Sequence, residues 1–189
     1  DADNLKDMFE QLDVFQNPKV LVSAPSSKVL GNMLGQTDIL EYFKNKGYDV
    51  MHITSKFGAV INGKKVGREL FFQTLQSWGA DDTRKFVIFH YSILSEGINV
   101  PGLTHTILLR NLPIIEMAQT IGRVIRVHKD DRAAVAAGEI PAGAFHLYKK
   151  SEGVVTMPTG YKMGNAIASR LQNVVNAIFI EGRPPVAFC

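Results

Sequence analysis

Short apolar runs alternate along the chain with segments whose apolar residues recur every three or four positions. The runs are typical of strands buried on both faces; they are KVLVSA (19–24), YDVMHIT (48–54), KFVIFHY (85–91), THTILLRN (104–111) and AFHLYKK (144–150). The helical segments are residues 5–15, 39–47, 68–78 and a stretch from Pro113 to about residue 127. This alternation predicts an α/β fold, an open and mostly parallel sheet with helices on both faces.

The last part of the chain, residues 151–189, is predicted to be a C-terminal extension of a domain formed by residues 1–150. We expect a hairpin or a strand there, followed by an amphipathic helix. The apolar positions of that helix recur at three and four: Met163, Ile167, Leu171, Val174, Val175 and Ile178. Its apolar face either packs on the core of the main domain or receives a partner domain.

Composition and charge narrow the class of protein. A hydrophobic content of 46% and a mean hydropathy of +0.01 are typical of a soluble globular protein. The net charge of +3 permits a nucleic-acid partner without requiring one. No apolar run reaches the roughly 18 residues of a membrane span, so no membrane partner is expected.

The cysteine content fits a cytoplasmic, intracellular location. Cys189 is the one cysteine of the chain and cannot form an internal disulfide, which agrees with a reducing compartment. With one cysteine and no H-x-x-x-H pair, no metal site is expected. Because the first residue is Asp1 rather than methionine, we interpret the chain as a piece of a longer protein.

The segment GAVINGKK (58–65) nearly matches the phosphate-loop consensus G-x-x-x-x-G-K-[ST]. Lys65 stands where the consensus needs a hydroxyl for magnesium, and an ammonium group cannot bind a cation. Asn62-Gly63 is also the strongest short signal for a two-residue hairpin turn. We therefore predict a turn or exposed loop here and phosphate binding elsewhere, with a self-sufficient phosphate-loop enzyme as a weaker alternative.

A more promising group of polar residues lies on the helix after Pro113. Gln119, Arg123 and Arg126 are spaced i, i+4 and i+7, which places them on one helix face. Guanidinium groups form charge-assisted hydrogen bonds of fixed geometry with phosphate. Spacing alone does not distinguish such an anion site from an ordinary solvated basic face.

A second polar segment, SILSEGINVPG (92–102), directly follows the apolar run KFVIFHY. Ligands of parallel sheets bind beyond the carboxyl ends of the strands, so Glu96 and Asn99 lie at the expected ligand edge. Gly97 permits backbone torsions that other residues avoid. Asn99 suits either a sugar hydroxyl or a simple turn, and we expect the arginines to point toward the same edge.

These two segments resemble motifs V and VI of superfamily 2 helicases. SILSEGINVP is similar to motif V, whose form is close to xxREGxDxP, and QTIGRVIR (119–126) matches motif VI, Q-x-x-G-R-x-x-R, at every defining position. KVLVSAPSSK more weakly resembles motif IV. The resemblance covers about residues 18–130 in family order. It implies the second RecA-like domain of a motor, which shares an ATP site with an N-terminal RecA-like domain of the same polypeptide.

The resemblance also implies roles for individual residues. Arg126 corresponds to the arginine finger on the γ-phosphate, Arg123 also faces the phosphates, and Gln119 helps to position the site. Gly97 and Asn99 match positions near the nucleotide ribose, although Asn99 replaces the commoner Asp. We assign the adjacent Glu96 to the same ATP-binding segment.

Nucleic-acid contacts are implied for Ser92 and for the loop that contains Ser26, Ser27 and Lys28. Tyr91-Ser92 differs from the Thr-Asp pair of the better-known DEAD-box members, which weakens this assignment and indicates another branch of the superfamily. ATP and Mg²⁺ would be bound mainly by the N-terminal domain, so no cofactor is expected on this chain alone. The track would be the backbone of DNA or RNA.

Two functions remain open at this point. The first is the C-terminal motor domain of an ATP-dependent nucleic-acid helicase or translocase, inactive when alone. The second is a non-catalytic nucleic-acid-binding or protein-interaction module that retains the fold. The intact trio of Gln119, Arg123 and Arg126 favours the motor, because a module without turnover has no evident need for it.

Overall fold

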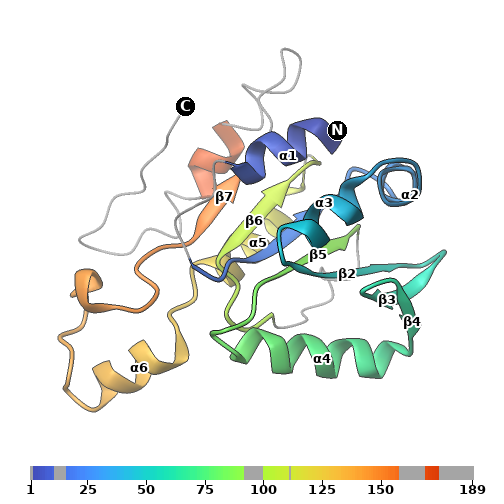
Figure 1. The fold of residues 1–189 in the computed structure, drawn as a ribbon. Coiled ribbons are helices and arrows are strands. Elements are labelled where there is room, and N and C mark those ends of the chain that lie inside the picture. The colour runs from blue at the N-terminus through green and yellow to red at the C-terminus, as the bar shows by residue number, and fades with distance from the viewer. Residues whose placement is uncertain (1, 11–15, 92–99, 111, 158–168, 175–189) are drawn as a thin grey trace.

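The computed structural model describes residues 2–10, 16–91, 100–110, 112–157 and 169–174. Within these residues lies a seven-stranded sheet in the order β4-β3-β2-β5-β1-β6-β7 (Figure 1). Its strands are β1 (Lys19–Ser23), β2 (Asp49–Thr54), β3 (Gly58–Ile61), β4 (Lys64–Val66), β5 (Phe86–His90), β6 (His105–Leu108) and β7 (Val154–Thr156). Strands β2, β5, β1, β6 and β7 are parallel, whereas β3 and β4 form an antiparallel edge.

Helices cover both faces of the sheet, which confirms the predicted fold class (Figure 1). They are α1 (Ala2–Glu10), α2 (Ser27–Gln36), α3 (Ile39–Asn45), α4 (Arg68–Ala80), α5 (Ile114–Val124) and α6 (Lys129–Ala136). Alternate strand residues point to opposite layers. Val20 and Val22 of β1 therefore pack in the cluster of α1, α2 and α3, whereas Leu21 packs in the cluster that contains Phe71 of α4.

The hairpin predicted at Asn62-Gly63 is confirmed. Strands β3 and β4 pair on either side of it, with backbone φ angles of 48° at Asn62 and 78° at Gly63. Positive φ at both central residues is what a type I′ turn requires. The Asn62 side chain also accepts a hydrogen bond from the backbone nitrogen of Val50 at 2.8 Å. GAVINGKK is thus a hairpin at the sheet edge and not a loop between a buried strand and a helix.

The strand predicted over residues 144–150 is wrong. Residues Phe145–Leu147 form a single 3₁₀ turn, and the strand that completes the sheet is β7, within the segment predicted as the extension. A strand would direct the backbone N–H groups of Lys149 and Lys150 to a neighbouring strand. They donate instead to the Asp131 carboxylate, at 2.8 and 3.0 Å.

The described part of the C-terminal helix packs on the domain core. Val174 is buried with Met117 and Ile121 of α5, and Leu171 packs against the same cluster. These contacts favour core packing over a partner surface for this turn of the helix. The other four apolar positions of its predicted stripe lie outside the described residues. Within the described ranges, the model contains no helix with the length and apolar character of a membrane span.

Candidate functional site

Helix α5 ends earlier than the sequence pattern predicts. Pro113 is its N-cap, Met117, Ile121 and Val124 form its buried face, and Ile125 is its C-cap. Arg126 therefore follows the helix instead of continuing its face. The expectation that Gln119, Arg123 and Arg126 share one helical face is wrong for this reason.

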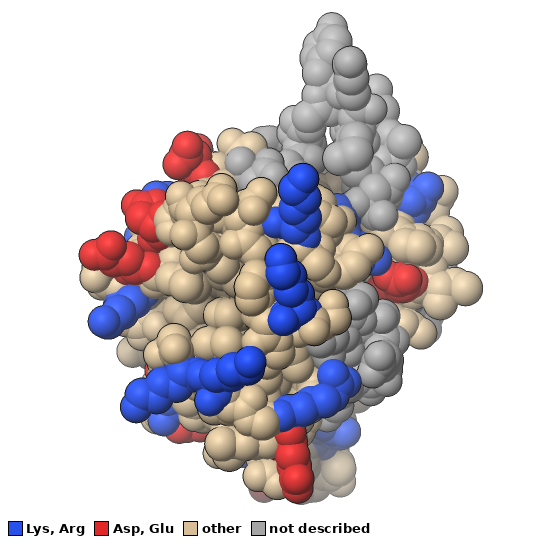
Figure 2. Space-filling model, turned by 90° about the vertical axis from the view of Figure 1, so that its right-hand side faces the viewer, with Lys and Arg blue, Asp and Glu red and all other residues tan. Residues whose placement is uncertain are grey.

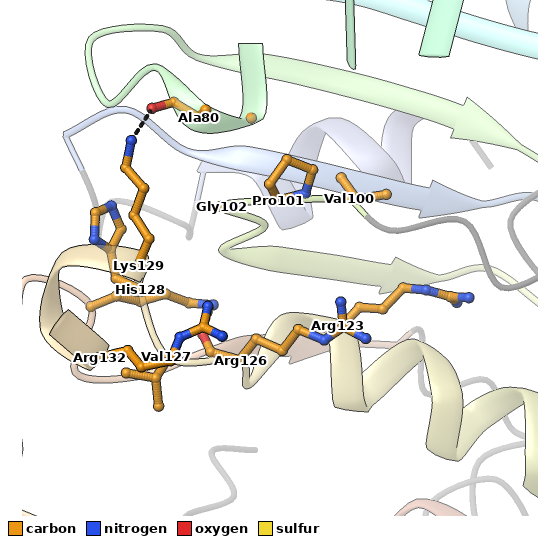
Figure 3. Close-up of a pocket in the computed structure, with 12 residues that line it drawn as sticks. Ala80, Val100, Pro101, Gly102, Arg123, Arg126, Val127, His128, Lys129 and Arg132 are labelled. Carbon is orange, nitrogen blue, oxygen red and sulfur yellow. Dashed lines mark hydrogen bonds between the residues drawn. The ribbon is translucent and has the colours of Figure 1, made fainter. Parts of the chain in front are cut away.

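The two arginines nevertheless reach one cavity of about 250 Å³ at the exit of α5 (Figure 3). Its wall combines the end of α4, the segment before β6, the loop after α5 and the start of α6. The lining residues are Gly79, Ala80, Val100, Pro101, Gly102, Arg123, Arg126, Val127, His128, Lys129, Arg132 and Lys150. Gln119 is exposed on α5 and does not line this cavity.

The charge of the cavity is one-sided. Among the described residues that line it, five are Lys or Arg and none is Asp or Glu. Arg123 is only 6% exposed, and the described residues offer its guanidinium no hydrogen-bond or ion-pair partner. Burial lowers the pKa of its guanidinium, and the nearby charge of Arg126 lowers it further. A cavity of this kind is suited to an anion.

The cavity lies beside the segments that lead into β5, β6 and β7, at the amino ends of these strands and not at the carboxyl edge expected from the sequence. From there, the Arg123 side chain reaches toward the carboxyl end of the sheet (Figure 3). His90 is the last residue of β5, and burial together with the charges of Arg110 and Arg123 lowers its pKa to about 3. The imidazole is therefore neutral beside the guanidinium. Figure 3 shows the side chains of Arg123 and Arg126 running in the direction of the strand arrowheads. For Arg123 this direction follows from helix geometry, since side chains tilt toward the helix N-terminus.

A buried lysine holds the exit of α5 in place. The ammonium of Lys150 donates to the backbone oxygens of Val124 and Arg126, the latter at 2.8 Å. Burial and the charge of Arg126 lower the pKa of Lys150 to about 8, whereas Asp131 acts in the opposite direction. Lysine side chains stabilise the last carbonyls of a helix in this way. Lys150 therefore both ends α5 and charges the cavity wall.

The segment after Lys150 packs equally tightly on this exit. A Cβ atom added to Gly153 would lie 2.5 Å from the backbone oxygen of Val124, a distance that real contacts do not reach. Sequence reasoning missed Lys150 and Gly153, because they lie far from the motif along the chain, and it missed Asp131, because the backbone groups that it binds belong to Lys149 and Lys150. No local pattern marks them.

At the start of α6, His128 connects two loops. Its Nε2 lies 2.8 Å from an Asp82 carboxylate oxygen, and its Nδ1 accepts from the backbone nitrogen of Asp130 at 3.1 Å. Asp130 in turn pairs with Lys149 at 2.6 Å. Ligand atoms of Asp82, His128 and Asp130 lie within 4.8 Å of one another, as in a metal site. Their mutual contacts account for this cluster as a cap on α6 that joins it to the loop after α4.

The residues predicted to touch nucleic acid are described only in part. The Ser26 hydroxyl caps α2 by accepting from the backbone nitrogen of Val29 at 3.1 Å, Ser27 begins that helix, and Lys28 is exposed. Ser92 lies outside the described residues. On the side that Figure 2 presents, lysine and arginine side chains are spread over the centre, and acidic ones lie toward the periphery.

The residues predicted to touch ATP from motif V, Glu96, Gly97 and Asn99, also lie outside the described residues. Val100, which directly follows them, lines the cavity with the arginine pair. The predicted ATP-binding segment is therefore continuous in sequence with a residue that lines the cavity.

Comparisons with known proteins identify the fold. No family model and no curated protein matches the chain. The solved structure titled "C-terminal part of Fun30 ATPase domain" has a TM-score of 0.51 and 18% identity, covering 89% of this chain and 44% of that one. A DNA-bound "ATP-dependent Type ISP restriction-modification enzyme LlaBIII" has a TM-score of 0.48 and 14% identity, covering 86% and 10%. The chain spans less than half of either structure, and it has the RecA-like α/β fold of the Fun30 domain.

Proposed function

We propose that this chain is the C-terminal motor domain of an ATP-dependent nucleic-acid helicase or translocase. In this proposal, Arg123 and Arg126 are its contribution to an ATP site completed by an N-terminal RecA-like domain. That domain would supply most contacts to ATP and Mg²⁺. Glu96, Gly97 and Asn99 would add contacts from the segment before Val100, and the surface near Lys28 and Ser92 would contact the nucleic-acid backbone.

The observation that carries this proposal is the environment of Arg123. A buried charge without a counter-charge costs several kcal/mol, so a fold retains one where a ligand compensates it. The cavity around Arg123 has no acidic residue among its described lining. A phosphate group supplies both the negative charge and the acceptor oxygens that guanidinium groups bind best.

The positions of the two arginines suit phosphoryl transfer. Negative charge is spread over the γ-phosphate oxygens in the transition state, and positioned guanidinium groups stabilise it. Arg123 is buried inside the cavity, whereas Arg126 is exposed and accessible to a second domain. Hydrolysis would then require the two domains to close around ATP, and each cycle of closure and opening would move the nucleic acid.

The test is ATP turnover by a protein in which this domain is joined to the lobe that carries a phosphate loop. Arg126→Ala should lower turnover by roughly a thousandfold or more, as loss of an arginine finger does. Lys56→Ala is the matched control, because Lys56 is exposed and does not line the cavity. Wild-type turnover in Arg126→Ala, with or without DNA or RNA, would show that Arg126 is not the arginine finger.

A further inference from the structure

The positive charge of the cavity continues past the motif pair onto helix α6. Lys129 and Arg132 both line the cavity, and their spacing of three residues places them on one face of α6. Lys129 also donates to the backbone oxygen of Ala80 at 3.2 Å, which anchors α6 against the end of α4. The cavity thus has a second cationic wall opposite the α5 exit.

The acidic residues of α6 do not neutralise this wall. Asp130 is paired with Lys149, and the Asp131 carboxylate accepts the backbone N–H groups of Lys149 and Lys150. Arg132, in contrast, is exposed, and its guanidinium has no hydrogen-bond or ion-pair partner within the described part of the chain. Arg132 is therefore available to a ligand in the cavity.

The size and charge of the cavity favour a short phosphate chain over a single ion or a whole nucleotide. Its volume of about 250 Å³ is below the range of roughly 300–1,000 Å³ that holds drug-sized ligands. Arg123 and Arg126 suffice for one phosphate group, since each guanidinium can donate two hydrogen bonds to it. Arg132 and Lys129 extend the same cationic lining to the N-terminus of α6, where the helix dipole also favours anions.

We propose that Arg132, supported by Lys129, forms a second phosphate subsite beside Arg123 and Arg126, so that the cavity holds two linked phosphate groups. This inference rests on the proposed function, because it assigns further residues to the same site. Arg132 would hold the phosphate group that precedes the transferred one. Its contribution would be to ligand affinity and alignment.

The test uses isothermal titration calorimetry of the 189-residue chain with inorganic pyrophosphate and with orthophosphate. The wild-type chain should bind pyrophosphate more tightly than orthophosphate. Arg132→Gln should lower the affinity for pyrophosphate about tenfold, as expected for the loss of a charge-assisted hydrogen bond. The affinity for orthophosphate should change much less.

Two further variants make the result specific. Arg68→Gln removes an equally exposed arginine near the β3–β4 hairpin and should bind as the wild type does. Arg132→Lys keeps the charge without the planar fork and should show an intermediate affinity. If Arg132→Gln lowers the melting temperature, the pyrophosphate affinity of Arg132→Lys is compared with that of the wild type instead. An oligothymidylate, whose phosphates are separated by sugars, should not displace pyrophosphate.

Three results would overturn the inference: equal affinity of the wild type for pyrophosphate and orthophosphate, unchanged pyrophosphate binding in Arg132→Gln, or displacement by the oligothymidylate. The proposed function stands or falls separately. Lost turnover in Arg126→Ala combined with unchanged pyrophosphate binding in Arg132→Gln would remove the second subsite only. Retained turnover in Arg126→Ala combined with weakened pyrophosphate binding in Arg132→Gln would remove the arginine-finger assignment only.

Discussion

Two cationic regions of the molecule differ in structure, the β3–β4 hairpin with Lys64 and Lys65 and the cavity at the exit of α5. The hairpin carries Gly58, Gly63 and Lys64 in nearly the spacing of a phosphate loop, yet Lys64 and Lys65 extend into solvent from the edge of the sheet. The cavity has no glycine-rich consensus, but its cations come from α5, the loop after it, α6 and the segment before β7, and all of them line one space.

The contrast shows which property makes a cationic cluster an anion site. Charges in water are screened within about 10 Å at moderate salt and contribute little to binding. A guanidinium that is 6% exposed, such as that of Arg123, acts where the dielectric constant is lower and its field is stronger. Convergence and burial therefore matter more than the spacing of residues along the chain.

Within this comparison of the two regions, the largest expected difference is in ATP turnover, when one cation is removed from either region. Arg123→Gln should lower ATP turnover of the two-domain protein by a hundredfold or more, because charge stabilisation in the transition state is lost. Lys64→Gln should leave turnover unchanged, since Lys64 is exposed on the hairpin. Turnover is measured at saturating ATP with both variants at equal concentration. Loss of ATP binding in Lys64→Gln would instead restore the hairpin as a phosphate loop.

The sequence predicts the parts of this comparison that depend on local chemistry. Asn62-Gly63 specifies its turn without help from the rest of the chain, because both residues tolerate positive φ. The strands of the sheet centre are equally local, since burial on both faces leaves an unbroken apolar run. The arginine spacing of motif VI is visible for the same reason.

The parts that fail depend on contacts between distant residues. Nothing after Val124 signals the end of α5, because the group that binds its carbonyl is Lys150, 26 residues away. A contact between distant residues also explains why the predicted strand over residues 144–150 is wrong. The backbone N–H groups of Lys149 and Lys150 donate to Asp131 of α6 and not to a neighbouring strand. Helical periodicity also places Gln119 with the two arginines, whereas Gln119 does not line the cavity and Arg132 of α6 does.

The next effect concerns stability and compares one glycine in each region. Gly153→Ala should destabilise the fold by about 3 kcal/mol, because the new methyl group meets the backbone of Val124 and forces a shift. Gly63→Ala should cost about 1 kcal/mol, the price of positive φ in open space. Urea unfolding measures both. Gly35→Ala is the control, since no atom lies within 4 Å of its added Cβ.

Equal losses in Gly153→Ala and Gly63→Ala would contradict the tight packing of the α5 exit. Only Gly153→Ala should also weaken pyrophosphate binding, because a shift of Val124 moves the loop that carries Arg126. Pyrophosphate binding therefore distinguishes a substitution that only strains the backbone locally from one that also displaces the residues of the cavity.

The smallest effect is the pH dependence that Lys150 adds to the cavity region. Its pKa of about 8 lies below the ordinary lysine value of 10.5, so between these pH values the unfolded chain holds more protons than the folded one. The contribution of Lys150 to stability should therefore rise with pH from 8 to 10.5, by on the order of 1–2 kcal/mol. Urea unfolding gives the free energy of unfolding of the wild type and of Lys150→Gln at pH 7.5 and 10. The change between the two pH values in the wild type, minus the same change in Lys150→Gln, is the contribution of Lys150.

The groups around Lys150 do not obscure this change. The buried His105, whose pKa is lowered to about 4, stays neutral over this pH range. Lys64→Gln is the matched control on the hairpin. The same pH rise should weaken pyrophosphate binding by the wild type more than by Lys150→Gln, because the cavity wall loses a positive charge. As the pH rises, the free energy of unfolding would then increase while the affinity for pyrophosphate decreases. A lysine that only stabilises the fold, far from the bound anion, would not lower the affinity.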